Sequence, residues 1–310
     1  MASWGALSTE ASNPLSEGLD MLSSEDVVSL ILEEDSRALA NARRSVEGIA
    51  RAASWVAETL AAGGGVMFAG AGTSGRLGIL EAAECPPTFG TDPEQIRAVI
   101  AGGPEAVFVA VEGAEDVSED GARAVEKLGP GDLLVALSAS SATPFVLGAL
   151  ASARACGART ILITCTGPGE ISQVADLVLA LDTGPEVLTG STRLKAGSAT
   201  KAVLNAITTA AMVQLGKVYG NLMVDLRPGS AKLRDRALRM IEGAGAVSRA
   251  EAERLYDAAD GEVKTAIVMA SCGLAAEGSR ERLRSAGGHV RKALAGQSRT
   301  EKGGPARSER

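Results

Sequence analysis

The sequence predicts a three-layer α/β/α sandwich on a five-stranded parallel sheet, with helices before it and a small helical bundle after it. Five short apolar runs of strand length support this prediction, at residues 66–69, 97–101, 133–138, 160–164 and 177–181. None of them alternates polar with apolar residues, as expected of strands buried on both faces. Segments of helix length separate the runs, and strand–helix alternation at this spacing is typical of a doubly wound sheet.

The helices on either side of the strands have their own signals. Ser23 and Asp26 stand at capping-box spacing, and helical periodicity continues to about residue 62 as two helices or one bent helix. Pro144 suits the first position of a helix. Between the strands we expect helices at residues 77–83, 104–112, 118–128, 144–156 and 169–175, followed by a long, mostly buried helix at 191–219.

The character of the chain changes near Ser248, which forms a second capping box with Glu251. Three short helices follow, at residues 250–259, 263–271 and 274–283. After residue 297 the chain is charged and rich in small residues, which favours disorder. We therefore expect an N-terminal helical segment (1–54), an α/β domain (55–220), a linker helix (221–246), a three-helix bundle (247–296) and a disordered tail (297–310).

Composition excludes several classes of protein. The net charge is −7 and no basic patch with interleaved aromatic residues occurs, which argues against nucleic-acid binding. No apolar run reaches ~18 residues, so no membrane span is expected. The four cysteines are scattered and there is one histidine, so neither a disulfide framework nor a metal site is predicted. The first residues do not resemble a signal peptide, and we expect a cytoplasmic protein.

A glycine-rich loop follows the first predicted strand. Its backbone N–H groups, including that of Gly72, would lie at the positive end of a helix, where phosphates bind. Thr73 and Ser74 add hydroxyl donors at the same place. A dinucleotide is the alternative ligand for such a loop. The second strand ends at Gly102 without the acidic residue that a dinucleotide site needs, so the loop favours a phosphate monoester.

A second loop rich in hydroxyl groups leaves the third strand. Ser138, Ser140 and Thr143 precede the helix that begins at Pro144, which again makes an anion-binding helix start. Ordinary capping is the alternative, but it needs only one hydroxyl. Because loops from neighbouring strands converge on one crevice, the two loops together favour phosphate binding.

Two carboxylates are candidates for proton transfer beside that phosphate. Glu84 ends the helix of the first loop and Glu115 follows the second strand, although most glutamates in a protein are only surface charges. Ser191 and Lys195 begin the long helix, where they either bind an anion or cap the helix. Cys85 has no histidine partner nearby, so it is not expected to be a nucleophile.

These residues belong to motifs that resemble N-acetylmuramic acid 6-phosphate etherases. The resemblance spans about residues 5–295, and its most specific block is Glu84-Cys-Pro-Pro-Thr-Phe-Gly90. The other matching stretches are residues 7–14, Gly70-Ala-Gly-Thr-Ser-Gly-Arg-Leu-Gly78, 100–103, Val111-Glu-Gly-Ala-Glu-Asp116, 188–195 and 221–225. The non-catalytic glucokinase regulatory protein of animals is a relative of this family.

The resemblance implies a sugar isomerase (SIS) domain and a lyase of amino-sugar metabolism. That enzyme removes D-lactate from N-acetylmuramic acid 6-phosphate and leaves N-acetylglucosamine 6-phosphate, without a cofactor or metal. By motif position, Glu84 matches the family's proton donor and Glu115 its second catalytic carboxylate. The family also implies a homodimer and a role in cell-wall recycling or in the use of foreign wall fragments.

One loop departs from the family pattern. Where the family usually has Ser-Gly-Arg-Thr-Pro, this chain has Ser140-Ser141-Ala142-Thr143-Pro144, so a glycine and an arginine are replaced. Ser141 fits the same backbone if its φ is negative. Two other functions stay open: a sugar-phosphate-sensing regulator that uses the terminal bundle as a partner surface, and an aldose–ketose isomerase. Retention of Glu84 and Glu115 favours the etherase over the regulator.

Overall fold

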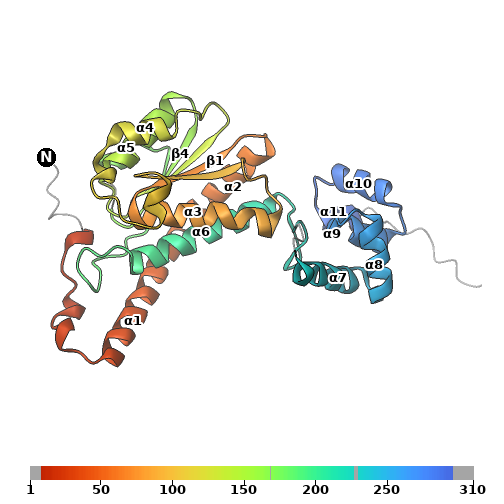
Figure 1. The fold of residues 1–310 in the computed structure, drawn as a ribbon, viewed down its shortest axis with the longest axis horizontal. Helices are drawn as coiled ribbons and strands as arrows, with labels where there is room; N and C mark the ends of the chain where they lie inside the picture. Colours follow the sequence, from red (N-terminus) through yellow and green to blue (C-terminus); the bar gives the residue numbers. More distant parts are fainter. Residues whose placement is uncertain (1–7, 168, 227–229, 296–310) are drawn as a thin grey trace, which may run out of the picture. The chain divides into compact units, whose positions relative to one another are not determined.

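The computed structural model describes residues 8–167, 169–226 and 230–295, which form two compact units (Figure 1). The first unit contains the chain up to Pro86 and residues 91–214, and the second contains residues 87–90 and the chain from Leu215 on. The N-terminal helices thus belong to the same unit as the α/β domain. The tail expected at 297–310 lies outside the described residues. Among the described helices, none is long and apolar enough to cross a membrane.

The first unit is built on the predicted parallel sheet, with strand order β2-β1-β3-β4-β5. The five strands are β1 (Val66–Gly70), β2 (Ile96–Ile100), β3 (Leu133–Leu137), β4 (Arg159–Thr164) and β5 (Leu177–Ala180). Every residue of β1 and β3 is buried, as the unbroken apolar runs predict. The chain runs from β1 to β2 on one side and then crosses back to β3 on the other. The crevice outside the carboxyl ends of β1 and β3 is therefore the expected ligand site.

Helices cover both faces of this sheet, so the three-layer prediction is confirmed (Figure 1). On one face α4 (Ser118–Ala124) and α5 (Pro144–Ala155) share a core with alternate strand residues such as Met67 and Leu134. On the other face lie α2 (Val46–Ala61), α3 (Gly72–Phe89) and α6 (Lys195–Gln214). Gly78 of α3 allows close packing on the sheet, since a Cβ there would meet the Cβ of Phe68 at 2.9 Å.

The N-terminal part begins with the short 3-10 turns η2 (Ser8–Glu10), η3 (Pro14–Ser16) and η4 (Leu19–Met21). Helix α1 (Ser24–Ala42) follows, and Ser23 caps it by accepting a hydrogen bond from the Asp26 N–H, as predicted. The turn η5 (Arg43–Ser45) separates α1 from α2, so the sequence forms two helices. Both helices pack against α6.

Several predicted helix boundaries were wrong. Residues 104–112 form only the 3-10 turn η6 (Pro104–Val107). The apolar side chains of Phe108 and Val109, directly after it, are 89% and 68% exposed, so burial does not stabilise a longer helix there. Residues 169–175 likewise form a 3-10 turn, η8 (Glu170–Val174). Helix α3 is longer than expected, and α4 and α6 are shorter.

The second unit contains a hairpin and five helices among its described residues. The hairpin pairs β6 (Val218–Tyr219) with β7 (Leu222–Met223), and the helices are α7 (Ala231–Gly245), α8 (Arg249–Ala258), α9 (Val263–Cys272), α10 (Ala276–Ser285) and α11 (Val290–Ala295). Ser248 caps α8 by accepting from the Glu251 N–H, as predicted. The expected three helices are α8, α9 and α10. Helix α7, expected as a linker, and α11 also contribute buried residues to their core.

Candidate active site

The loop between β1 and α3 lies at the carboxyl edge of the sheet. Gly70 ends β1, and a Cβ there would meet the N atom of Gly75 at 2.8 Å, so the helix starts very close to the strand. Gly72 is the first residue of α3 and has a φ of +54°. Thr73 and Ser74 are partly exposed in the first turn of this long helix. The free N–H groups and positive end of α3 therefore point to where an anion would bind.

A small hollow of about 150 Å³ lies beside this helix start. Glu115 of the 3-10 turn η7 (Ala114–Asp116) lines it together with Gly72, Arg76 and Glu112, and we call it the Glu115 hollow. Arg76 donates from Nε to the carbonyl of Val107 at 2.9 Å, which ties the first turn of α3 to the loop that carries Glu115. The structure thus brings the first loop and one of the two predicted catalytic carboxylates together.

Glu84 lies elsewhere on the same helix. It is exposed and twelve residues beyond Gly72, which corresponds to about 18 Å along the axis of α3 at 1.5 Å per residue. It does not line the Glu115 hollow. One turn earlier, the buried Glu81 accepts hydrogen bonds from Lys201 Nζ at 2.6 Å and Thr208 Oγ1 at 2.5 Å. These bonds fix α3 against α6 and thereby orient the segment that carries Glu84.

The second loop leaves β3 at the same edge of the sheet, because Gly70 pairs with Leu137 in the parallel register. Ser138 is buried, and its Oγ lies 2.9 Å from Oγ1 of Thr143, the N-cap residue of α5. Ser140 is partly exposed. The two hydroxyl-bearing loops therefore begin side by side, as the order of the strands predicted.

The condition stated above for Ser141 is not met, because its φ is +56°. The left-handed conformation costs a residue with a Cβ roughly 1–2 kcal/mol. Ser141 is buried, its N–H donates to the Ser138 carbonyl at 3.3 Å, and its Oγ lies 3.3 Å from Oγ of Ser172. The loop thus keeps the backbone that suits the family's glycine, although a serine now occupies the position.

Lys195 is the first residue of α6, and Ser191 precedes the helix. Ser191 is partly exposed, in the turn before the helix. The Lys195 side chain is only 5% exposed, and its Nζ donates to Oε2 of Glu34 at 2.5 Å. Asn13 and Arg37 donate to the same carboxylate at 2.8 and 2.9 Å. The charge of Lys195 is thus compensated by a glutamate of α1.

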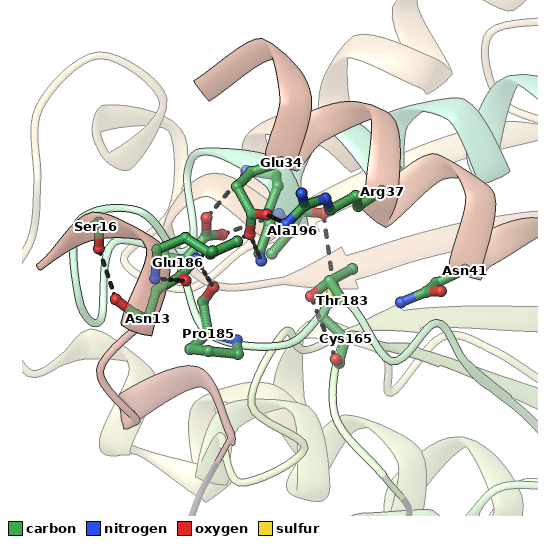
Figure 2. Close-up of polar contacts among 12 residues, drawn as sticks. Asn13, Ser16, Glu34, Arg37, Asn41, Cys165, Thr183, Pro185, Glu186 and Ala196 are labelled. Atoms are coloured by element: carbon green, nitrogen blue, oxygen red, sulfur yellow. Dashed lines mark hydrogen bonds and ion pairs between the residues drawn. The ribbon is translucent and has the colours of Figure 1, made fainter. Parts of the chain in front are cut away.

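These donors change the acidity of Glu34. Burial acts to raise its pKa, but hydrogen bonds from Lys195 and Asn13 and the charges of Lys195 and Arg37 outweigh burial, so the pKa lies below its usual value. Glu186 accepts from the backbone N–H groups of Ala196 and Lys195 at 2.9 and 3.2 Å (Figure 2). Burial raises the pKa of Glu186, against the effect of those bonds. The contacts of Glu34, Lys195 and Glu186 join the N-terminal segment, the loop before α6 and α6 itself.

Sequence reasoning missed Arg76, Glu112, Glu34 and Glu186 as neighbours of the predicted site. Arg76 lies within the glycine-rich motif, so its position in the first turn of the helix was the signal available. Cys85, which was not expected to be a nucleophile, is buried. Burial and the charge of Glu81 raise the pKa of Cys85 to about 12. Among the described residues, no cluster of three or more metal-ligating side chains occurs.

Comparison with known proteins defines the class first. The family model "SIS domain" matches residues 108–210, and the model "Glucokinase regulatory protein N-terminal SIS domain" matches residues 48–154. The chain is therefore a SIS-domain protein, in agreement with its five-stranded parallel sheet. A solved phosphoheptose isomerase from Neisseria gonorrhoeae has a TM-score of 0.48 at 20% identity, over 61% of this chain and 98% of that one.

Full-length relatives then identify the family. An N-acetylmuramic acid 6-phosphate etherase of Cutibacterium acnes is 48% identical over 92% of this chain and 95% of its own length. The etherase of Geobacillus thermodenitrificans is 47% identical over 93% and 98%, and that of Mycolicibacterium smegmatis is 45% identical over 93% and 98%. The chain belongs to the N-acetylmuramic acid 6-phosphate etherase family.

Proposed function

We propose that this protein cleaves the D-lactyl ether of N-acetylmuramic acid 6-phosphate, giving N-acetylglucosamine 6-phosphate and D-lactate. The observation that carries the proposal is the 48% identity with an etherase over 92% of the chain. The Glu115 hollow supports it, because a carboxylate there adjoins the anion-binding start of α3. Its substrate carries a phosphate, so the enzyme needs a phosphate site. Its reaction, that of a carbon–oxygen lyase, also needs groups that transfer protons.

We propose that the phosphate binds at the first turn of α3. Gly72, Thr73 and Ser74 offer N–H and hydroxyl donors there, and an 18-residue helix adds its dipole. Hydroxyls of the neighbouring loops complete the polar wall on this side of the substrate. These groups belong to Ser138, Ser140, Thr143 and Ser191. Lys195 acts on the site through the backbone that leads from Ser191 into α6.

The chemistry uses the substrate's own carbonyl. In the open-chain aldehyde the C1 carbonyl acidifies the C2 proton, and a carboxylate removes it as a general base. The C3–O bond then breaks, a protonated carboxyl group donates to the departing lactate oxygen, and a C2–C3 double bond forms. Water adds its hydroxyl to C3 and a proton returns to C2. Glu84 is the proposed proton donor and Glu115 the second carboxylate, so no cofactor is required.

We propose further that the enzyme acts as a homodimer in the cytoplasm and serves cell-wall recycling. Phe108 and Val109, in the loop that leads to Glu115, are 89% and 68% exposed, and a partner subunit would cover them. All four cysteines are free thiols, which suits a reducing compartment. Glu84 is distant from Gly72 along α3. In a homodimer, Glu84 of one copy could instead contribute to the site of the other copy.

The alternative function is a sugar-phosphate sensor without catalysis. The match of residues 48–154 to the glucokinase regulatory protein model is the observation in its favour. A sensor needs the anion-binding helix start but neither glutamate. The two functions therefore differ in turnover and not in binding.

The test is D-lactate release from N-acetylmuramic acid 6-phosphate, with N-acetylglucosamine 6-phosphate identified by mass spectrometry. We expect release by the wild type and a fall of about 10²–10⁴-fold in Glu84→Ala and in Glu115→Ala. Glu119→Ala, an exposed glutamate of α4, is the matched control and should retain activity. Binding of the sugar phosphate without lactate release would instead assign the sensor function, and a ketose product would assign an isomerase.

A further inference from the structure

The second unit contains a hollow that is larger than the Glu115 hollow. Its volume is about 840 Å³, within the range typical of sites for small molecules. Its lining combines charged side chains with Tyr256 and four apolar side chains. The apolar residues are Val224, Leu226, Val263 and Leu283. We call it the Lys264 hollow, after the less exposed of the two lysines that line it.

The two lysines that line the hollow have one carboxylate partner between them. Lys217 and Lys264 both contact one oxygen of Asp225, with Nζ–Oδ2 distances of 3.0 and 2.8 Å. Two ammonium groups thus share one carboxylate, which leaves one positive charge in excess. The side chain of Lys264 is 12% exposed and that of Lys217 is 26% exposed. A cation that is partly removed from water gains most from a further anion.

The effect of this crowding is visible in the acidity of Lys264. Burial lowers its pKa and the charge of Lys217 lowers it further, whereas Asp225 acts in the opposite direction. The carboxylate of Asp225 thus compensates the charge of the Lys264 ammonium group only in part. An anion that binds between the two lysines would restore the balance.

A helix start faces the same hollow. Val263, Lys264 and Thr265 form the first turn of the ten-residue helix α9, and all three line the hollow. The N–H groups of a first turn have no acceptor within their own helix, and they add to the positive potential. The N-cap residue, Glu262, makes no side-chain capping bond to them. Its carboxylate binds Arg280 Nε at 2.9 Å and Thr265 Oγ1 at 2.7 Å instead.

The other two cations that line the hollow already have carboxylate partners. Arg280 contacts Asp260 at 2.7 Å as well as Glu262, and Arg284 contacts Glu277 and Glu281. The excess of positive side chains therefore lies at the pair of lysines, and the apolar side chains belong to the same lining. A ligand that matches this surface has an anionic group at one end and a carbon skeleton at the other.

We infer that the Lys264 hollow is a second ligand site, which binds a phosphorylated monosaccharide or another small organic anion of that size. The phosphate oxygens lie between the ammonium groups of Lys217 and Lys264 and the first N–H groups of α9. The sugar ring packs against Tyr256 and the apolar side chains of the lining. This site uses only residues of the second unit, and it stands whether or not the proposed etherase activity is correct.

Calorimetry of the full chain tests the inference. Inorganic phosphate and N-acetylglucosamine 6-phosphate are titrated separately, and two binding sites per chain are expected for the sugar phosphate. Lys264→Met and Lys217→Met should each weaken one site at least tenfold and leave the other unchanged. Lys232→Met, an exposed lysine of α7 that does not line the hollow, is the matched control and should leave both sites intact. A wild type with a single site, or a second site that survives both hollow variants, overturns the inference.

A second readout needs no substitution of a buried residue. In protein labelled with ¹³C at the lysine Cε, the pKa of Lys264 should rise when N-acetylglucosamine 6-phosphate is added, because an anion stabilises the ammonium form. No shift at saturating sugar phosphate contradicts the proposal, and this holds even if Lys264→Met does not fold. D-lactate release, measured on the same samples, reports on the etherase proposal separately, so failure of one is distinguishable from failure of the other.

Discussion

Replacing Lys195 with methionine removes one partner of a buried ion pair at the start of α6. Both side chains of the pair are 5% exposed, and the Nζ–Oε2 distance is 2.5 Å. Loss of one partner from such a pair typically costs about 3–5 kcal/mol, because the remaining charge is left in a poorly solvated place. Asn13 and Arg37 still donate to Glu34, so we expect the lower end, about 3 kcal/mol.

The assay is urea unfolding followed by the fluorescence of Trp55, which lies in α2 of the first unit. A Trp4→Phe background leaves Trp55 as the only tryptophan of the chain. The control is Arg123→Met, which breaks an exposed ion pair with Asp120 and should cost less than about 1 kcal/mol. The double variant Lys195→Met/Glu34→Gln should recover part of the loss, since no buried charge is then left unpaired and Arg37 is 58% exposed.

The loss should also depend on pH. The pKa of Glu34 lies below its ordinary value, so the pair contributes fully above about pH 4.5 and its contribution disappears as the pH falls through the lowered pKa. The difference between wild type and Lys195→Met should therefore shrink in that acidic range. If Lys195→Met is as stable as Arg123→Met but loses affinity for the sugar phosphate, Lys195 is a ligand for the substrate, and the structural role argued for it is refuted.

Two further predictions concern single residues. Burial raises the pKa values of Cys85 and Cys165 to about 12 and about 11, so at pH 8 about one molecule in a thousand or fewer carries either thiolate. Iodoacetamide should therefore label Cys156 and Cys272 in the native protein, and rapid labelling of Cys85 would contradict the burial argument. Ser141→Gly should change stability by less than about 1 kcal/mol, because relief of the left-handed strain offsets a lost hydrogen bond and a more flexible unfolded chain. Ser141→Val, with a branched Cβ at the same φ, should lose more than about 2 kcal/mol by thermal unfolding, and equal stability of the two variants would refute the strain.

The sheet could be predicted because its signal is local. The runs that became β1 and β3 are continuous and apolar, and strands buried on both faces have no other pattern. The site loops followed from strand order, since the ends of parallel neighbours meet at one edge. This is why Gly72 and Glu115, 43 positions apart in the sequence, were both expected at the crevice, and both line one hollow.

What could not be predicted depends on partners far along the chain. Lys195 has the residue type and the helix position of an anion ligand, yet its charge meets Glu34, 161 positions earlier. The segment at 104–112 has helical composition, but its apolar residues Phe108 and Val109 are exposed and the 3-10 turn ends at Val107. Helix α7 shows the same limit, because a linker helix and a helix of the bundle differ in what packs against them. No local pattern indicated that α7 would bury Leu238 and Ile241 in the bundle.

The proposed reaction is elimination and hydration at C3 of the sugar, with Glu84 and Glu115 as the proposed proton-transferring groups. Its most direct test is turnover of N-acetylmuramic acid 6-phosphate in water enriched in ¹⁸O and in D₂O. We expect ¹⁸O in the C3 hydroxyl of N-acetylglucosamine 6-phosphate, deuterium at C2 and unlabelled D-lactate, with turnover lost in Glu115→Ala. Label in the lactate, hydrogen retained at C2, or full turnover by Glu115→Ala would contradict it.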